Sequence, residues 1–445
     1  MTENNSGFAE ESVASSAQAG GSDRSAARGT FFLGRYRWVI CAVLFIGISK
    51  NYMDRSVLGV LKVTLQHDLG WNEIDYGHLV FAFQAAYAVG MLALGRFIDR
   101  VGTRIGYSVA MLFWSLASMA HALCGSLTSF GFARAALGLG ESGAFPASMK
   151  TVTEWFPQKE RALATGIFNA GTNVGAIMTP LIVPSITNHL GWRWAFLITG
   201  AIGFLWVLLW MTVYRKPEEH PRCSEAELDY IRSDREKPTV RAPWGRLLGY
   251  RQTWAFLIAK FLTDPIWWFY LFWVPGFFQQ RHGLNLTHIG LPIVVIYVIS
   301  DVGSVAGGWL SSRLIKRGLS VNAGRKVAML ICAVCVVPIV YAYRVESLWG
   351  TVLLIGLAAA AHQGFSANLF TTPSDMFPSH AVASVVGIGG MAGAAGGMLI
   401  ANIVGHVLQT TGSYLIPFFM AGTAYLIALG VLHVIVPKLQ PVNSV

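Results

Sequence analysis

The sequence predicts an all-α integral membrane protein with twelve transmembrane helices, arranged as two bundles of six. Of its 445 residues, 54% are hydrophobic and only 13% are charged, and the mean hydropathy is +0.50. This composition lies outside the range of soluble globular proteins. The apolar residues form blocks of about 20, the length that an α-helix needs to cross the hydrocarbon core. Soluble enzymes and most nucleic-acid-binding proteins are therefore excluded.

Residues 1–34 are rich in Ser, Ala, Gly and Glu without apolar periodicity, so we expect a disordered cytoplasmic tail and no signal peptide. One long polar stretch, 215–251, is predicted to be a cytoplasmic loop between an N-terminal bundle, 35–214, and a C-terminal bundle, 252–437. A second cytoplasmic tail, 438–445, ends the chain. The twelve spans are expected near 37–60, 76–98, 104–124, 127–150, 160–185, 192–214, 252–280, 288–313, 323–344, 348–371, 380–408 and 412–437.

The basic residues are unevenly distributed between the two sets of loops. The chain has 33 Lys and Arg against 23 Asp and Glu, a net charge of +10. Most of the basic residues fall on the side of the N-terminus, whereas the opposite loops offer only Lys62, Arg193, Arg281 and Arg344. Because cytoplasmic loops are enriched in Lys and Arg, both termini and the central loop are predicted to be cytoplasmic. The orientation of the loops then accounts for the net positive charge, and we expect no nucleic-acid partner.

Cysteines and sequence motifs indicate neither a metal site nor an enzyme. The pair Cys332 and Cys335 has the C-x-x-C spacing but no second pair or histidine cluster, so we interpret the five cysteines as packing residues. Phosphate-binding, metalloprotease and serine-hydrolase motifs are missing from the chain. We therefore expect no cofactor, no metal and no catalytic residues.

Ionisable residues within the spans are the first candidates for a functional site. Inserting such a residue at the centre of a transmembrane helix costs about 2.5 to 3.5 kcal/mol of free energy, so it normally faces a cavity and has a function. The first span holds Lys50, Asp54 and Arg55, and the fourth holds Arg134 and Glu141, which are seven residues apart and share one helix face. A carboxylate shielded from water can carry a proton, and an arginine fork suits a substrate carboxylate. Structural ion pairs that fix helix packing are the alternative.

The predicted spans of the second half have almost no ionisable residues near their centres, but they have many polar and aromatic residues. Pro265 and Pro275 in the seventh span predict a discontinuous, gating helix. The lack of further acids favours protons over sodium as the coupling ion, because sodium needs several oxygen ligands. Side chains that suit the hydroxyls and apolar faces of a sugar, or else interhelical hydrogen bonds, are Trp267, Tyr270, His362, Gln363 and Asn368.

One loop carries a recognisable signature. The segment G-R-F-I-D-R-V-G-T-R, from Gly95 to Arg104, resembles the loop between the second and third helices of the major facilitator superfamily. The corresponding segment of the second half, Gly308 to Arg317, lacks the acid. The resemblance implies the twelve-helix major facilitator fold and a role in the cytoplasmic gate for Asp99, Arg100 and Arg104.

Further motifs resemble the anion:cation symporter family over residues 35–437, and within it the hexuronate branch that imports galacturonate and glucuronate. These motifs are N-Y-M-D-R, R-A-A-L-G-L-G-E-S-G-A-F-P-A, T-E-W-F-P-Q-K-E-R-A-L-A-T-G-I-F-N-A-G and F-L-T-D-P-I-W-W-F-Y-L-F-W-V-P. Lys50 departs from the family pattern. The resemblance implies that Asp54 and Glu141 bind protons, and that the substrate is contacted by Tyr52, Arg55, Tyr87 and Arg134, with Asn169 and Asn173 of the fifth span as polar sugar contacts.

The sequence therefore predicts a monomeric secondary transporter that imports a hexuronate-type sugar acid with protons by alternating access. We expect it in the lipid bilayer of a bacterial cytoplasmic membrane. Sodium stays open as the coupling ion. Galactonate or another aldonate, an aldarate or another small carboxylate stays open as the substrate, and so does a receptor that binds the anion without transporting it.

Overall fold

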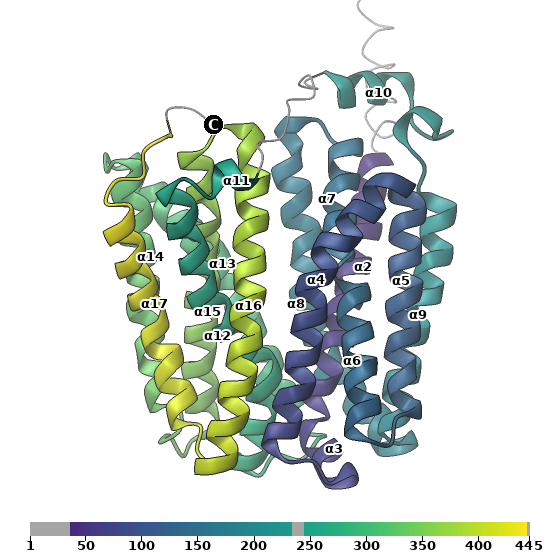
Figure 1. The fold of residues 1–445 in the computed structure, drawn as a ribbon, viewed down its shortest axis with the longest axis vertical. Helices are drawn as coiled ribbons and strands as arrows, with labels where there is room; N and C mark the ends of the chain where they lie inside the picture. The colour runs from purple at the N-terminus through teal and green to yellow at the C-terminus, as the bar shows by residue number, and fades with distance from the viewer. Residues whose placement is uncertain (1–35, 234–243, 443–445) are drawn as a thin grey trace, which may run out of the picture.

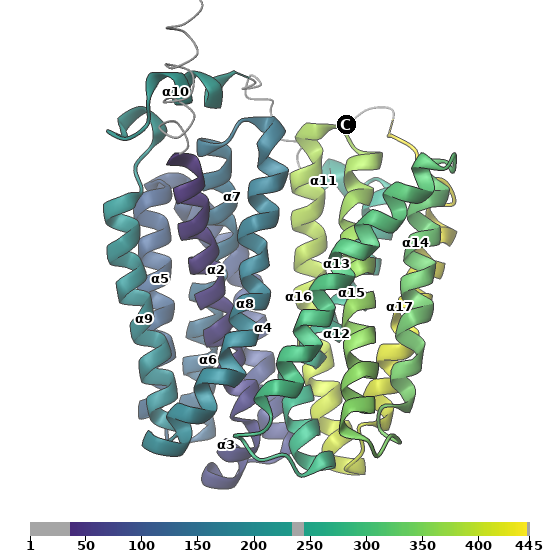
Figure 2. The ribbon, with the colours of Figure 1, turned by 180° about the vertical axis from the view of Figure 1, so that it is seen from behind.

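The computed structural model describes residues 36–233 and 244–442, so the predicted N-terminal tail lies outside the described residues. Every regular element in the described residues is helical. The helices form two groups that stand side by side, α2 to α9 and α12 to α17 (Figures 1 and 2). Helix α10 of the central connection lies at one end of the molecule and α3 at the other, and we call these the α10 end and the α3 end.

The helices of the first bundle are α2 (Tyr36–Val60), α3 (Lys62–Leu69), α4 (Glu73–Val101), α5 (Thr103–Ala120), α6 (Leu127–Glu141), α7 (Ala144–Trp155), α8 (Gln158–Leu190) and α9 (Trp192–Val213). The connection carries α10 (Glu225–Arg232) and α11 (Trp244–Leu247). The helices of the second bundle are α12 (Arg251–His282), α13 (Gly290–Lys316), α14 (Val321–Val336), α15 (Leu348–Met376), α16 (Ser379–Thr411) and α17 (Leu415–Ile435). With the short α3 set aside and α6 and α7 counted as one segment, six segments cross in each bundle, as predicted.

Hydropathy alone recognises fewer of these crossings. Among the described residues, nine helices are long and apolar enough to span a membrane, and α4 makes a tenth when its two parts, bent by 42°, are joined. Two crossings do not pass this test. Helix α2 is less apolar because it carries Lys50, Asp54 and Arg55, and the crossing formed by α6 and α7 is divided into two short helices. The two crossings that hydropathy misses are those that carry the candidate charges of the first bundle.

The division between α6 and α7 was not predicted, whereas the break predicted in the seventh span is wrong. Helix α12 runs without interruption through Pro265 and Pro275, because neighbouring helices in a membrane protein can support a helix that lacks these two amide donors. The fourth span instead breaks at Ser142 and Gly143, and Pro146 occupies the first turn of α7, where no amide donor is needed. Consequently Glu141 is the last residue of α6.

The connection between the bundles packs against the first of them. The Glu227 carboxylate of α10 accepts hydrogen bonds from the backbone amides of Tyr36 and Arg37, at 3.1 and 3.2 Å. The guanidinium of Arg37 also lies 3.1 Å from Glu227 and 2.9 Å from Glu160 of α8. Burial, reinforced by the nearby Glu227 carboxylate, raises the pKa of the Cys223 thiol to about 11. Helix α10 is therefore held against the start of α2.

Polar contacts between the bundles concentrate at the α3 end. Lys62 Nζ lies 2.7 Å from Glu73 Oε2 in the first bundle and 3.3 Å from the Tyr414 hydroxyl in the second. The Tyr76 hydroxyl donates to the carbonyl oxygen of Phe272 at 2.7 Å. These groups are buried or nearly so. The two bundles are therefore joined at this end.

Glycines allow the backbones to meet at the same end. A Cβ atom on Gly59 of α2 would lie 2.8 Å from the carbonyl oxygen of Leu271 on α12. A Cβ atom on Gly77 of α4 would lie equally close, 2.8 Å, to the carbonyl oxygen of Ala401 on α16. Side chains at either position would separate the helices, so small residues are required for this closure.

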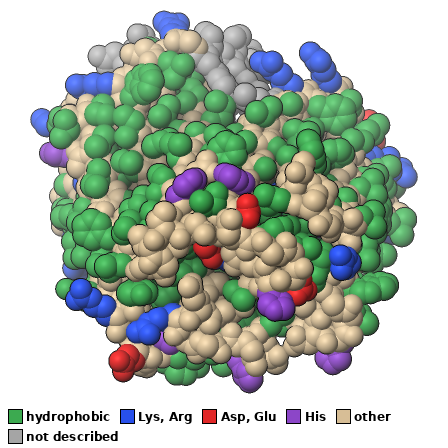
Figure 3. Space-filling model, turned by 60° about the horizontal axis from the view of Figure 1, so that its bottom comes forward, with side chains coloured by type: hydrophobic (Ala, Val, Ile, Leu, Met, Phe, Trp, Pro, Cys, Tyr) green, Lys and Arg blue, Asp and Glu red, His purple; other side chains and the backbone are tan. Residues whose placement is uncertain are grey.

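The outer surface is apolar. Hydrophobic side chains cover the flanks in Figure 3, and exposed examples include Leu205, Leu208 and Ile427, with 68%, 66% and 54% exposure. An exposed apolar surface of this extent marks an interaction with lipid rather than with water.

Candidate functional site

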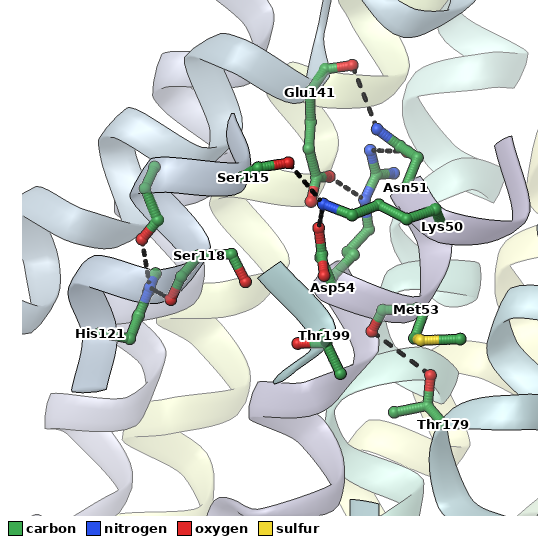
Figure 4. Close-up of polar contacts among 12 residues, drawn as sticks. Lys50, Asn51, Met53, Asp54, Ser115, Ser118, His121, Glu141, Thr179 and Thr199 are labelled. Carbon is green, nitrogen blue, oxygen red and sulfur yellow. Dashed lines mark hydrogen bonds and ion pairs between the residues drawn. The ribbon is translucent and has the colours of Figure 1, made fainter. Parts of the chain in front are cut away.

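Two buried ion pairs involve α2 of the first bundle. Lys50 and Asp54 of α2 form one pair within their own helix, and Lys50 also donates to the Ser115 hydroxyl of α5 at 3.0 Å (Figure 4). Asp54 is 0% exposed, and Thr199 of α9 lies beside it. The lysine that departs from the family pattern is therefore the partner of the proposed proton-binding acid.

The second pair joins α2 to α6. Arg55 Nε lies 2.9 Å from Glu141 Oε2, and Arg55 Nη2 donates to Asn51 Oδ1 at 3.3 Å. Asn51 in turn donates to the backbone carbonyl of Glu141 at 3.4 Å, as Figure 4 shows. Arg55 and Glu141 are 1% and 0% exposed. The break after α6 places the Glu141 side chain opposite Arg55.

Aromatic rings surround the Arg55 guanidinium. Its Cζ atom lies 4.7 Å from the ring centre of Tyr52, 4.8 Å from Tyr87 and 5.1 Å from Phe83, all in the first bundle. A fourth ring, Trp268 of α12, lies at 5.1 Å and belongs to the second bundle. Such contacts stabilise a desolvated cation. Tyr52 and Tyr87, which were predicted to contact the substrate, are therefore neighbours of Arg55. The contact with Trp268 places Arg55 at the interface between the bundles.

Arg134 differs from the other buried cations. It is 0% exposed, and none of its three side-chain nitrogens has a hydrogen-bond partner among the described residues. Its guanidinium lies over the ring of Phe83, 4.5 Å away, and 5.8 Å from that of Phe272. Although Arg134 and Glu141 share α6, the ion pair of Glu141 is with Arg55. A buried guanidinium with free donors is costly and is well suited to bind a carboxylate.

The predicted sugar contacts of α8 do not lie together. Asn169 is exposed on the helix surface. Asn173 donates to the Asp301 carboxylate of α13 and thus connects the two bundles at mid-depth. In this conformation the donor of Asn173 is engaged by a protein carboxylate.

The predicted contacts of the second bundle lie mainly inside that bundle. The rings of Trp267 and His362 stack at 5.1 Å, and His362 hydrogen-bonds the Tyr425 hydroxyl at 2.6 Å. Asn368 donates to two backbone carbonyls of α13 and α15, both at 2.9 Å. Tyr270 and Trp267 line a small cavity, and Gln363 is half-buried. The hydrogen bonds of His362 to Tyr425 on α17 and of Asn368 to Gly307 on α13 are interhelical contacts, the alternative that the sequence left open.

The three residues predicted for the cytoplasmic gate lie at the α10 end. Asp99 Oδ1 is 3.1 Å from Lys150 Nζ of α7, and Arg104 donates to the backbone carbonyl of Met211 at 2.6 Å. Arg100 is exposed. Both contacts are within the first bundle, and the gate role of these residues stays a prediction.

The expectation that the second bundle has almost no central charges is wrong. Lys260 and Asp264 form an ion pair on α12, with Nζ and Oδ2 2.7 Å apart, and Asp301 lies within α13. Spacing could have revealed the first pair, because Lys260 and Asp264 repeat the four-residue separation of Lys50 and Asp54. The argument from missing acids for protons over sodium therefore loses its premise.

The family model described as Major Facilitator Superfamily matches residues 44–401. The chain belongs to the major facilitator superfamily. It is therefore a multi-pass membrane transporter and not an enzyme, and its twelve crossing segments are those of the superfamily's fold.

Relatives within the superfamily agree with the resemblance found in the sequence. The hexuronate transporter of Escherichia coli strain K12 is 32% identical over 384 residues, which cover 84% of this chain and 88% of the relative. The D-galactonate transporter of Escherichia coli O6:H1 is 30% identical over 393 residues, covering 85% and 91%. An inward-facing, occupied structure of a bacterial homologue of the human lysosomal transporter Spinster has the same fold, with a TM-score of 0.74 at 18% identity, covering 91% of this chain and 97% of that one. The resemblance to sugar-acid carriers is thus confirmed.

Proposed function

We propose that this protein imports a hexuronate-type sugar acid together with protons across a bacterial cytoplasmic membrane, by alternating access and as a monomer. The observation that carries the proposal is the fully buried Arg134 guanidinium, which has no hydrogen-bond partner among the described residues. Two relatives of the chain, a hexuronate transporter and a D-galactonate transporter, support a sugar acid as the anion.

The substrate carboxylate would bind between Arg134 and Arg55. The guanidiniums of Arg134 and Arg55 lie 4.5 and 5.1 Å from the centre of the same ring, that of Phe83, and this shared neighbour is why we place the carboxylate between them. The planar fork of arginine matches two carboxylate oxygens. Tyr52 and Tyr87 would complete this part of the site, with rings that cover the apolar C–H faces of the sugar.

Proton coupling follows from competition for Arg55. When the substrate carboxylate takes the place of Glu141 at this guanidinium, the Glu141 carboxylate loses its ion-pair partner while it stays buried. A buried carboxylate without a partner is unstable in its charged form and binds a proton instead. Substrate binding and proton binding therefore favour each other, as thermodynamic linkage requires. Asp54, paired with Lys50, is the second proposed proton site.

The excess of basic loops favours a cytoplasmic location for the α10 end. The bundles are joined at the α3 end by the contacts of Lys62 and Tyr76, so the conformation is then the inward-facing one. In the outward-facing state Asp99, Arg100 and Arg104 would help to close the cytoplasmic side.

Transport by purified protein in liposomes tests the proposal. We expect labelled galacturonate or glucuronate to accumulate when the outside is made acidic, and not in response to a sodium gradient. Because a hexuronate carries one negative charge, two protons per substrate move one positive charge inward, worth about 2.3 kcal/mol per 100 mV. Two acids predict this stoichiometry, and hence inward current on adding substrate.

Three other results would redirect the proposal. Accumulation of galactonate or an aldarate in place of hexuronates would change the substrate. Dependence on a sodium gradient would change the coupling ion. Tight binding of the anion without any flux would favour the receptor alternative.

A further inference from the structure

The buried amide of Gln84 on α4 has no role in the site described so far. Its side chain is 0% exposed, and neither Oε1 nor Nε2 has a hydrogen-bond partner among the described residues. A primary amide offers two donors and an oxygen acceptor, and burying it without partners is costly. Helix propensity does not explain a glutamine here, because leucine would stabilise helix α4 about equally well.

The position of Gln84 links it to the anion site. It follows Phe83, whose ring centre lies 4.5 Å from the Arg134 guanidinium and 5.1 Å from that of Arg55, and it precedes Tyr87 by three residues on the same helix. Consecutive residues of a helix point about 100° apart, so the side chains of Gln84 and Phe83 leave α4 in different directions.

The neighbours of Gln84 in the second bundle are Trp268 of α12 and Gly397 of α16. A Cβ atom on Gly397 of α16 would lie 3.3 Å from Gln84 Cδ and 2.9 Å from Trp268 Cδ1, so the amide and the indole border the same point. The same indole faces the Arg55 guanidinium at 5.1 Å. The amide of Gln84 therefore lies at the bundle interface, next to the ring that also borders the anion site.

We propose that Gln84 hydrogen-bonds two adjacent hydroxyl groups of the transported sugar acid and thereby determines the preference for polyhydroxylated carboxylates. This inference rests on the proposed function. The chemistry is complementary, because one hydroxyl donates to Oε1 while its neighbour accepts from Nε2. The Trp268 ring offers the apolar surface against which the C–H face of the same sugar packs.

A purely structural role makes a different prediction. If Gln84 only fills space between α4 and α16, an apolar side chain of similar size is tolerated and every ligand is affected equally. If Gln84 reads hydroxyls, its removal affects only those ligands that carry them. A binding cycle between protein variants and ligand variants separates the two roles.

The experiment measures the binding of galacturonate and its 2-, 3- and 4-deoxy analogues to purified wild-type protein and to Gln84→Leu and Gln84→Met, the second variant guarding against misfolding of the first. We expect that removing one hydroxyl of an adjacent pair weakens binding to wild type about tenfold, as one lost hydrogen bond would. The same removal should change binding to either variant less than twofold. Ser118→Ala is the matched control, because it removes a different buried polar group, a hydroxyl on α5 that also has no hydrogen-bond partner among the described residues.

Two results would overturn the inference in distinguishable ways. Equal losses for every deoxy analogue in wild type and in both variants would return Gln84 to packing while leaving the proposed function intact. Failure of wild-type protein to bind any sugar acid would remove the proposed function and this inference with it.

Discussion

Replacing Glu141 with glutamine tests the coupling mechanism most directly. Glu141 is the carboxylate that neutralises Arg55, at 2.9 Å, and Arg134 has no hydrogen-bond partner among the described residues. The amide keeps the shape of the side chain but leaves two buried guanidiniums without a carboxylate. Breaking one side of a buried ion pair costs about 3 to 5 kcal/mol, and the remaining amide oxygen places this case near 3 kcal/mol.

A bound sugar acid should restore most of this loss. Its carboxylate supplies the missing negative charge, and a ligand at one hundred times its Kd stabilises the folded state by about 2.7 kcal/mol. We therefore expect the substrate-free Glu141→Gln protein to unfold at lower temperature than wild type. Saturating galacturonate should raise its unfolding temperature more than it raises that of wild type.

Transport should separate coupling from binding in the same variant. A side chain that cannot ionise cannot release a proton to the cytoplasm, so accumulation driven by a pH gradient should fail while counterflow exchange persists. Asp229→Asn is the matched control, because it removes an exposed carboxylate of α10 and should leave both assays unchanged. An unchanged dependence of uptake on the pH gradient in Glu141→Gln would remove this residue from the mechanism.

Three further predictions address other parts of the molecule. Arg134→Lys keeps the charge but loses the planar fork, so galacturonate should bind at least about tenfold more weakly, whereas the exposed Arg193→Lys should bind normally; equal affinities would make Arg134 a structural residue. Lys62→Met removes a contact that joins the bundles at the α3 end, so a cysteine introduced at the buried Val60 should react faster with a membrane-impermeant maleimide added outside; an unchanged rate would place the closure elsewhere. The raised pKa of Cys223, about 11, keeps its thiol protonated at pH 8. In a variant without the other cysteines, the alkylation rate at pH 8 should therefore be about a hundredfold lower than that of a free thiol, and the rate should continue to rise up to pH 11. A rate that reaches its plateau near pH 9 would refute the packing of α10 against the first bundle.

Local sequence was sufficient to predict the membrane class, the six-plus-six arrangement and the charged residues of α2 and α6. Each follows from a property that a single segment carries: the length of an apolar run, the composition of a loop, or the cost of a charge in hydrocarbon. The loop from Gly95 to Arg104 was sufficient for the superfamily, because its residues are contiguous. Hydropathy was a poorer guide for α12, where an apolar background concealed Lys260 and Asp264.

The partners of the charged residues were decided by tertiary structure. Helical spacing places Arg134 and Glu141 on one face of α6, but only the packing of α2 against the end of α6 pairs Glu141 with Arg55. The break that ends α6 depends on neighbouring helices as well as on Pro146, because two other prolines leave α12 unbroken. Spacing along one helix determines which residues share a face, whereas the neighbour of that face depends on how several helices pack, and this leaves Arg134 without a protein partner among the described residues.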